Sequence, residues 1–424
     1  MAYLLALLYL ACIYLRPAEI VPGWETFPFA ACIAAVSALC MAGSLVLRPR
    51  RFWNLPQDWF VLGFLVAVVV SNAAWGWMSG AVEALLAIAP AIFCYFLLRG
   101  AVETPRQLRW VRYTLLALTL FHAANGIVQF HTGIGLGGVV PVEAHPLDAD
   151  EEVDAETRRI RGTGIFNDPN DLALTLVVMV PFLVGPLIRR ATQMSVRVGA
   201  FVLLLPILIA LYYTNSRGGM LGLAAALLPY GYRRFGRFVG LVTSGAGLAL
   251  LIFLGPSRMA QLDASESSAQ NRVQSWAEGL QMFKSHPLFG VGFGRYTEFN
   301  ELVAHNSFVH TLGELGLLGS FCFVGMGYCF FINTSRAIGE HGGWGEDLWQ
   351  SGLGLAVCAM FLSRQYSVVL FVWLALSGGY VQVMTSLEPP APRLSLQLTR
   401  IAAITAGGVL STYVMVRFFG NWTA

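Results

Sequence analysis

His305 and Asn306 end a long polar stretch and open an apolar segment that reads HNSFVHTLGELGLLG. An imidazole titrates near neutrality and can take a proton from a hydroxyl nucleophile, so His305 is the best candidate for a catalytic base. A histidine that begins a helix can equally well cap that helix or pack against it. His310 follows five residues later and does not share the helix face of His305 closely. The sequence has no Ser-His-Asp, Cys-His or nucleophile-elbow pattern.

Three arginines are candidates for holding a phosphorylated ligand. Arg217 stands in TNSRGG between two apolar segments, where its side chain either meets a ligand or reaches the lipid phosphates. Arg161 and Arg272 stand in two long polar loops, where an arginine is ordinarily solvated. A planar guanidinium binds phosphate oxygens in bidentate fashion, so several guanidinium groups together can hold a diphosphate without a metal.

Asp168 and Asp171 lie in the sequence NDPND, just before an apolar run. Asn167 or Asp168 is expected to cap the following helix, with Pro169 at its first position and Asp171 complementing the helix dipole. The alternative is a pair of metal ligands spaced three residues apart. No third carboxylate follows nearby, so the capping interpretation is preferred and no metal site is predicted.

The composition indicates an integral membrane protein. Of the 424 residues, 56% are hydrophobic and 12% are charged, against about 25% charged residues in a soluble domain. Apolar runs of about 20 residues recur along the chain, and a backbone in the bilayer must satisfy its own hydrogen bonds as helices. The predicted fold is all-α and polytopic, with about 12–13 transmembrane helices. The first apolar run is expected to be a membrane helix and not a removed signal.

The apolar runs give the positions of the predicted helices and contain the cysteines. The helices are expected at residues 2–15, 27–47, 58–75, 81–98, 110–130, 170–189, 197–213, 217–231, 236–254, 308–332, 349–362, 366–386 and 397–418. The cysteines all fall in apolar spans and are Cys12, Cys32, Cys40, Cys94, Cys322, Cys329 and Cys358. An odd number in such places argues against a disulfide framework or a metal cluster, so we expect small buried core residues.

The arginines report the topology of the helices. Alternate connections hold Arg48, Arg50 and Arg51; Arg99, Arg106 and Arg109; Arg189, Arg190 and Arg197; Arg233, Arg234 and Arg237; Arg336; and Arg393 and Arg400. The connection at 76–80 holds none, and those at 16–26, 214–217 and 363–365 hold one arginine each. Because basic residues favour the cytoplasmic side, both long loops and the turn with Arg217 are expected on the opposite side of the membrane.

The two long loops divide the chain into five parts. These are membrane helices at 1–130, a first loop at 131–169, central helices at 170–254, a second loop at 255–305 and C-terminal helices at 306–424. The acidic run Asp148 to Glu156 is expected to be solvated, and the glycines from Gly133 to Gly138 to form a flexible turn and not a nucleotide site. In the second loop, apolar residues recur at helical spacing and end at a His-Pro pair, which predicts an amphipathic helix lying on the membrane or capping a cavity. These apolar residues are Val273, Trp276, Leu280 and Phe283.

Several stretches together resemble one family. His305-Asn306 is followed after nine residues by a GxxG sequence that begins at Gly316 and ends at Gly319. This pattern resembles the HN-x9-GxxG signature of the bacterial O-antigen ligase family. The stretches RGTGIFNDPNDLAL, TNSRGGMLGL and NRVQSWAEGLQMFKSHPLFGVGFGRY resemble other conserved blocks of that family and of the related O-antigen and exopolysaccharide polymerases.

The resemblance implies a multi-helix glycosyltransferase of the polyprenyl-phosphate-using type, in the bacterial inner membrane, with its active site facing the periplasm. It implies inverting, metal-independent transfer of a glycan from undecaprenyl diphosphate to a hydroxyl of lipid A–core, or polymerisation onto a growing glycan, with no cofactor. Arg217 and Arg272, and less closely Arg161, match arginines that engage the donor diphosphate. His305 matches the acceptor-activating histidine, supported by Asn306, Gly316 and Gly319. The implied partners are these glycolipids and membrane lipids, not nucleic acid.

A transporter or flippase with a lid is a second hypothesis from a different class. Many helices and glycine-rich spans would suit it. No inverted repeat is found, and no predicted span is expected to carry an acidic residue at its centre except Glu83, which lies near an end, whereas transporters commonly place coupling carboxylates within their helices.

Overall fold

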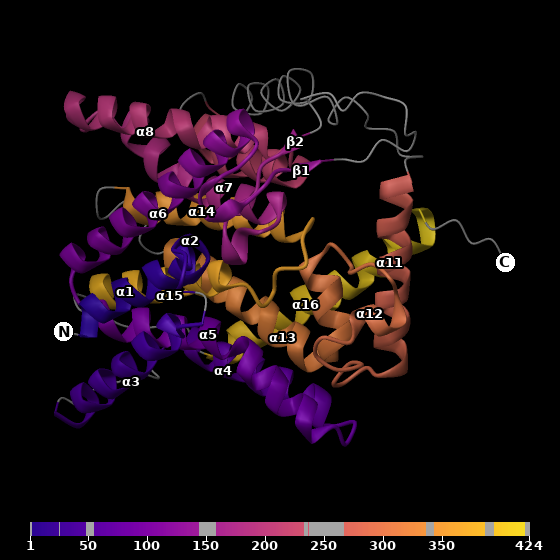
Figure 1. The fold of residues 1–424 in the computed structure, drawn as a ribbon. Helices are drawn as coiled ribbons and strands as arrows, with labels where there is room; N and C mark the ends of the chain where they lie inside the picture. Colours follow the sequence, from indigo (N-terminus) through magenta and orange to yellow (C-terminus); the bar gives the residue numbers. More distant parts are fainter. Residues whose placement is uncertain are drawn as a thin grey trace. The chain divides into compact units, whose positions relative to one another are not determined.

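The computed structural model describes residues 2–24, 26–47, 55–143, 158–232, 236, 267–335, 343–385 and 394–419. These residues are almost all helical, which confirms the predicted all-α fold (Figure 1). Within them, seven helices are long and apolar enough to cross a membrane, and three shorter apolar helices accompany them. The chain divides into two compact units, each made of three segments.

Unit 1 comprises residues 1–46, 101–262 and 337–358. Its helices are α1 (Ala2–Leu15), α2 (Pro17–Ile20), α3 (Phe29–Leu47), α6 (Pro105–Thr132), α7 (Pro169–Ile188), α8 (Met194–Tyr213), a helix over 217–232, and α14 (Trp344–Ala359), which ends at the boundary of the unit. The side chains of α7 are buried without interruption from Leu172 to Leu183. Helix α7 is therefore the core of this unit, with α6 and α8 packed against it.

Short elements in unit 1 follow α6 and precede α7. They are η1 (Leu136–Gly138), β1 (Val142–Glu143), β2 (Arg158–Arg159) and η3 (Gly164–Phe166). Strands β1 and β2 pair antiparallel, with Val142 opposite Arg159. The two strands lie within the first predicted loop, one before and one after its acidic run, which lies outside the described residues.

Unit 2 comprises residues 47–100, 263–336 and 359–424. Its helices are α4 (Pro56–Ala73), α5 (Met78–Ala101), α11 (Ser267–Ser285), α12 (Tyr296–Phe299), α13 (Ser307–Ser335), α15 (Val368–Thr385) and α16 (Leu394–Phe419). Helix α13 packs against α4, α11, α15 and α16 and is the centre of this unit (Figure 1).

Most predicted helices have counterparts in the structure, and one predicted span cannot be compared. The predicted span 236–254 lies outside the described residues apart from residue 236.

The prediction that all seven cysteines are buried is wrong for Cys32, which is exposed, and for Cys40, which is half-buried. Both lie on α3, whose side chains remain largely uncovered by protein, as a lipid-facing helix allows.

The amphipathic helix predicted in the second loop is confirmed as α11, which ends at Ser285, directly before His286-Pro287. Its apolar face is covered by protein. Leu280 packs in a cluster with Leu312 of α13 and Val416 of α16, with Trp276 and Phe283 beside it. The apolar periodicity is thus explained by packing against α13 and α16.

Each unit contains a buried ionic pair among its described residues. In unit 2, the buried Arg99 lies 3.6 Å from Asp58 Oδ1, and the Tyr95 hydroxyl donates to the same oxygen at 2.6 Å. In unit 1, Arg189 and the Tyr230 hydroxyl both donate to Asp347. Removing one partner of such a buried pair costs about 3–5 kcal/mol, because the other charge is left uncompensated.

Candidate active site

His305 and Asn306 lie directly before α13 and have different structural tasks. The Asn306 side-chain oxygen accepts hydrogen bonds from the backbone N–H groups of Phe308 (3.0 Å) and Val309 (3.1 Å). Asn306 is therefore the residue that caps α13. His305 is half-buried and has a φ of 47°, a left-handed conformation that is uncommon for a residue with a side chain. The histidine is held at the helix entrance in a conformation that the cap and its surroundings must maintain.

Helix α11 is hydrogen-bonded to the residue before His305. The Trp276 indole N–H donates to the Ala304 carbonyl at 2.8 Å. Arg272 lies one helical turn before Trp276 and is half-buried, with its guanidinium carbon 6.0 Å from the centre of the Phe361 ring. In unit 2, the structure therefore couples the positions of Arg272 and His305 through one turn of α11 and one hydrogen bond.

The connection between α14 and α15 also reaches the start of α13. The Ser307 hydroxyl donates to the Leu362 carbonyl at 2.6 Å, and the backbone N–H of Arg364 donates to the Ser307 oxygen at 2.9 Å. Phe361, which faces Arg272, belongs to the same connection. Sequence reasoning used Arg364 only as a topology marker. Its signal was that it is the single arginine of a short connection between two helices, as Arg217 is.

Glu314, inside α13, organises a buried polar cluster. Its carboxylate accepts from the Tyr296 backbone N–H at 3.1 Å and the Tyr366 hydroxyl at 2.8 Å, and it lies 3.0 Å from His310 Nε2. Only 1% of Glu314 is exposed. The expectation that Glu83 is the one acidic residue within the spans is wrong, because Glu314 lies inside α13, where these three partners retain it.

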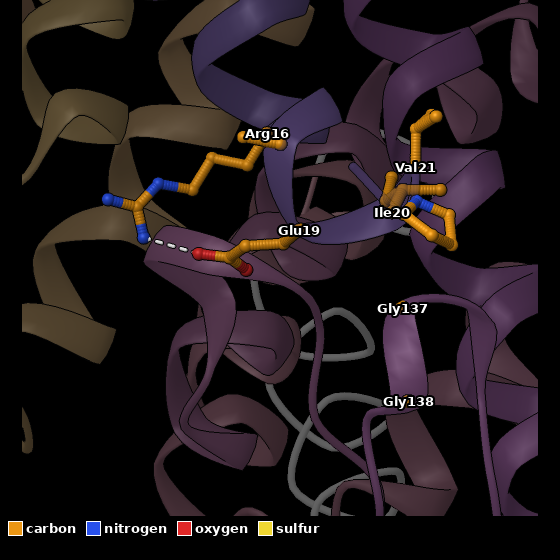
Figure 2. A pocket seen from close by; sticks show the side chains of 8 residues that line it. Arg16, Glu19, Ile20, Val21, Gly137 and Gly138 are labelled. Carbon is orange, nitrogen blue, oxygen red and sulfur yellow. Dashed lines mark hydrogen bonds and ion pairs between the residues drawn. The ribbon is translucent and has the colours of Figure 1, made fainter. Parts of the chain in front are cut away.

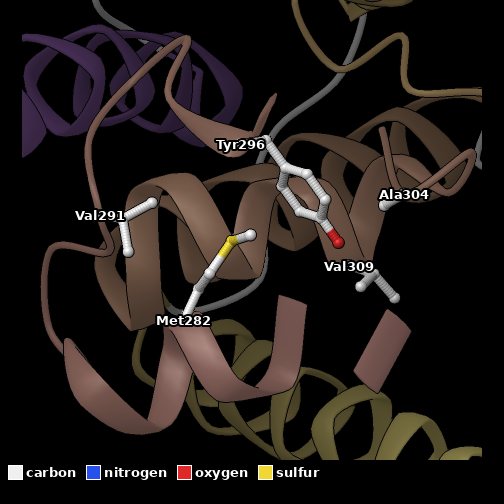
Figure 3. Close-up of a cluster of buried hydrophobic side chains, with 5 residues drawn as sticks. All are labelled: Met282, Val291, Tyr296, Ala304 and Val309. Atoms are coloured by element: carbon white, nitrogen blue, oxygen red, sulfur yellow. The ribbon is translucent and has the colours of Figure 1, made fainter. Parts of the chain in front are cut away.

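Tyr296 links this polar cluster to α11. Its ring is buried with Met282, Val291, Ala304 and Val309 (Figure 3), and its hydroxyl donates to the Ser275 carbonyl. Burial, together with the nearby carboxylates of Glu314 and Glu278, raises the pKa of Tyr296 above its ordinary value. The hydroxyl therefore stays protonated as a hydrogen-bond donor. Helices α11 and α13 are joined here as well as at Trp276.

Gly316 and Gly319 explain the GxxG part of the signature. Gly316 interrupts α13 with φ 60° and ψ −153°, and a Cβ there would lie 2.6 Å from the Leu288 carbonyl carbon. Beyond the break, the N–H groups of Leu317 and Leu318 donate to the carbonyls of Pro287 and Leu288, at 2.8 and 3.2 Å. Gly316 therefore allows the loop after α11 to bond to the broken helix. A Cβ on Gly319 would meet the Leu315 side chain at 2.2 Å.

The same loop completes the pairing on the other side of the break. Val291 and Gly292 donate their N–H groups to the carbonyls of Gly313 and Glu314, both at 3.0 Å. The carbonyls freed by the break are therefore satisfied by the loop. Phe293 N–H donates to Ser71 of α4 at 3.0 Å, which fixes the loop against a third helix.

In unit 1, the turn before Arg217 is tied to the segment that carries Arg161. Ile160 N–H donates to the Tyr213 carbonyl at 3.1 Å, and Arg159 Nε donates to the Thr214 carbonyl at 3.1 Å. Asn215, in the turn itself, has a φ of 50°. Arg217 is half-buried at the start of the helix over 217–232.

Arg161 is held through both its backbone and its side chain. Its N–H donates to the Gln129 side-chain oxygen at 2.9 Å, and its Nε donates to the Val140 carbonyl at 2.8 Å. Unit 1 therefore brings the segments of Arg161 and Arg217 together, and unit 2 does the same for Arg272 and His305. Residues beside the first pair, Arg159 and Ser216, bond to Asn170 at the start of α7, and His305 lies directly before α13.

The start of α7 confirms the predicted cap. The Asp168 side chain accepts from the Asn170 N–H at 2.7 Å, and Pro169 occupies the first helical position. The Asn170 side-chain oxygen accepts from Ser216 at 2.7 Å and from Arg159 at 3.1 Å. The NDPND sequence thus caps α7 and anchors the turn before Arg217. In the described parts of the chain, no three His, Cys, Asp or Glu residues gather as metal ligands would.

Comparison with known proteins gives one family and no curated relative. A search of curated proteins found no match. The matching family model is described as Wzy_C, O-Antigen ligase, and it covers residues 199–324. That range contains Arg217, Arg272 and the whole His305 to Gly319 segment, and it leaves Arg161 outside. The match supports a glycosyltransferase-like enzyme of the O-antigen ligase or polymerase type. Over this central part, the chain's resemblance to the O-antigen ligase family is confirmed.

Proposed function

We propose that this protein transfers a glycan from undecaprenyl diphosphate to a hydroxyl of lipid A–core, on the periplasmic face of the bacterial inner membrane. The family match over residues 199–324 supports the reaction type. The observation that carries the proposal is the coupling of Arg272 to His305 through the hydrogen bond from Trp276 to Ala304. This bond relates a phosphate-binding group to a proton acceptor, the two groups that the reaction needs.

In the proposed reaction, the acceptor oxygen attacks the anomeric carbon from the side opposite the diphosphate. The new bond from carbon to acceptor oxygen forms as the bond from carbon to phosphate oxygen breaks, which inverts the anomeric centre. His305 takes the hydroxyl proton, and undecaprenyl diphosphate leaves with the bonding electrons. A positioned base of this kind contributes roughly 10²–10⁴ in rate.

The arginines are proposed to stabilise the leaving group. Negative charge on the diphosphate grows as the glycosidic bond breaks, and a fixed donor aimed at growing charge lowers the barrier by about 3 kcal/mol. We assign this role to Arg217 and Arg272, with Arg161 as an additional donor. The ties of Arg161 to Gln129 and Val140 support a fixed position, which limits the reorganisation needed during reaction.

The test uses purified full-length protein in nanodiscs with a labelled undecaprenyl-diphosphate-linked repeat unit. The donor is given alone and then with lipid A–core, and the products are sized on a gel. Labelled product that requires lipid A–core is the expected result. A ladder formed from donor alone would identify a polymerase instead. Movement of intact donor across the bilayer with no covalent change would contradict both and favour a transporter.

A further inference from the structure

Backbone strain marks a third position besides those of the proposed reaction. Among the described residues, three that are not glycine have a positive φ: Arg16 at 47°, Asn215 at 50° and His305 at 47°. Such conformations cost about 1–3 kcal/mol and cluster at functional sites. His305 is the proposed base, and Asn215 shapes the turn before Arg217. Arg16 has no part in the proposed reaction, and it is the single arginine of its connection.

Arg16 lines an open pocket of about 740 Å³ in unit 1 (Figure 2). The pocket walls are the segment Ala18 to Pro22 and the glycines Gly137 and Gly138. Arg16 Nη1 donates to the Glu19 carboxylate at 2.6 Å, and the two side chains are 54% and 40% exposed. The pocket volume falls in the usual range for a small-molecule site, about 300–1,000 Å³.

The ion pair contacts the loop that also carries Arg161. The second Glu19 oxygen accepts from the Gly164 N–H at 2.6 Å, and a Cβ on Gly164 would lie 2.3 Å from Arg16 Cδ. A Cβ on Gly137 would lie 2.8 Å from the Glu19 carbonyl oxygen. The glycines at 137 and 164 therefore let two loops close around the pair, which orients both charged groups.

The pair suits a ligand with hydroxyl groups. A guanidinium has about five N–H donors and a carboxylate about four acceptor sites, so each group keeps hydrogen-bonding capacity beyond the bonds it makes here. Glu19 offsets the charge of Arg16, so a small free anion gains little from this pocket. Neighbouring sugar hydroxyls, which both donate and accept, match the arrangement.

A second pocket, of about 290 Å³, adjoins the first and shares Arg16 and Ala18 with it. Its other walls are apolar and include Phe27, Pro28 and Phe29. The Trp24 and Phe29 rings lie 4.7 Å apart, and 44% of Trp24 and 52% of Phe27 are exposed. Exposed aromatic rings at the start of an apolar helix such as α3 are typical of the membrane interface. The second pocket therefore suits a hydrocarbon chain.

We infer that the two pockets that meet at Arg16 bind a glycolipid, with its saccharide between Arg16, Glu19 and the Gly137-Gly138 loop and its chain against Phe27 and Phe29. This inference rests on the proposed function for the identity of the glycolipid. Two sources share the chemistry, a polyprenyl-linked glycan and the acyl-chain glycolipid acceptor.

The test is photocrosslinking on the full chain in nanodiscs of phosphatidylethanolamine and phosphatidylglycerol. A photoreactive residue replaces Val21 in the polar pocket or Ala31 in the apolar one, and Leu39, 74% exposed on α3, is the matched control position. Labelled lipid A–core, an undecaprenyl-diphosphate-linked saccharide and phosphatidylglycerol are added separately. At least one glycolipid is expected to label both pocket positions several-fold above Leu39, and the more strongly labelling probe identifies the source.

Further variants, made in the protein that carries the photoreactive residue at position 31, complete the test. Arg16→Ala is expected to weaken labelling at position 31 by about tenfold, as loss of a charged hydrogen-bond partner predicts, whereas exposed Arg106→Ala leaves it unchanged. Val21→Trp fills the polar pocket without removing the ion pair and should give the same loss. Equal labelling by phosphatidylglycerol, or labelling no stronger than at Leu39, overturns the inference. Because labelling needs no turnover, a chain that binds glycolipid and transfers nothing refutes the proposed function alone.

Discussion

Replacing Glu314 should weaken the packing of α11 against α13 and lower the stability of the protein. In Glu314→Ala, the Tyr296 N–H, the Tyr366 hydroxyl and His310 all lose their acceptor inside the protein. A buried hydrogen-bonding group left without its partner costs about 1–3 kcal/mol, and three such groups lose their acceptor here, so we expect the free energy of unfolding to fall by roughly 3 kcal/mol or more. Glu314→Gln keeps one carbonyl oxygen and the size of the side chain, so its cost should be about 1–2 kcal/mol.

The cysteines provide the assay. Cys12, Cys94, Cys322, Cys329 and Cys358 are buried, and two of them lie on α13. In a background with Cys32 and Cys40 replaced by alanine, a thiol-reactive dye reports unfolding on heating. The matched control is Glu298→Gln, which removes a 51% exposed carboxylate paired with Arg295 and should change stability by less than about 1 kcal/mol.

The outcome for Glu314→Ala decides whether the cluster stabilises this unit. We expect the melting temperatures to fall in the order control, Gln variant and Ala variant. Glycan transfer should fall in the same order, because Tyr296 bonds to Ser275, one turn after Arg272. An Ala variant that melts and transfers like the Glu298→Gln control would refute the reasoning.

Three other substitutions test separate parts of the site. Asn306→Ala should cost about 0.5–2 kcal/mol in the thiol assay through loss of the α13 cap, and an unchanged melting temperature would count against that cap. Gly316→Ala should cost about 1–3 kcal/mol because of its positive φ, whereas Gly327→Ala, with no atom near its Cβ, should be tolerated in the same assay. Arg272→Lys should raise the KM for donor in initial-rate measurements, because lysine lacks the bidentate fork, and an unchanged KM would remove Arg272 from donor binding.

Local sequence signals anticipated much of the fold. Helical periodicity anticipated α11, and the Asp-Pro pair anticipated the cap of α7, because both depend on neighbours within one or two turns. The partners of Glu314 could not be anticipated in this way. Tyr366 lies 52 residues away and Tyr296 lies 18 residues away, so only tertiary packing brings them to the carboxylate.

In the candidate site, too, local sequence patterns identified residues but not their tertiary contacts. The HN-x9-GxxG pattern singled out His305 and Gly316, but it did not reveal that Asn306 caps α13 or that Gly316 breaks it. Arg16 and Arg364 carried one weak signal, because each is the single arginine of a short connection. An arginine that only reflects the membrane topology gives the same signal. The strained backbone at Arg16 and the hydrogen bond from the Arg364 N–H to Ser307 are structural features that the sequence does not reveal.

The most direct test of the central claim is a single-turnover transfer assay with His305→Ala. The control is His131→Ala, which removes an exposed histidine from the last turn of α6. If His305 is the base, its removal should slow transfer by roughly 10²–10⁴ while donor binding and melting temperature stay at the control values. A His305→Ala protein that transfers the glycan at the rate of the His131→Ala control would contradict the assigned role.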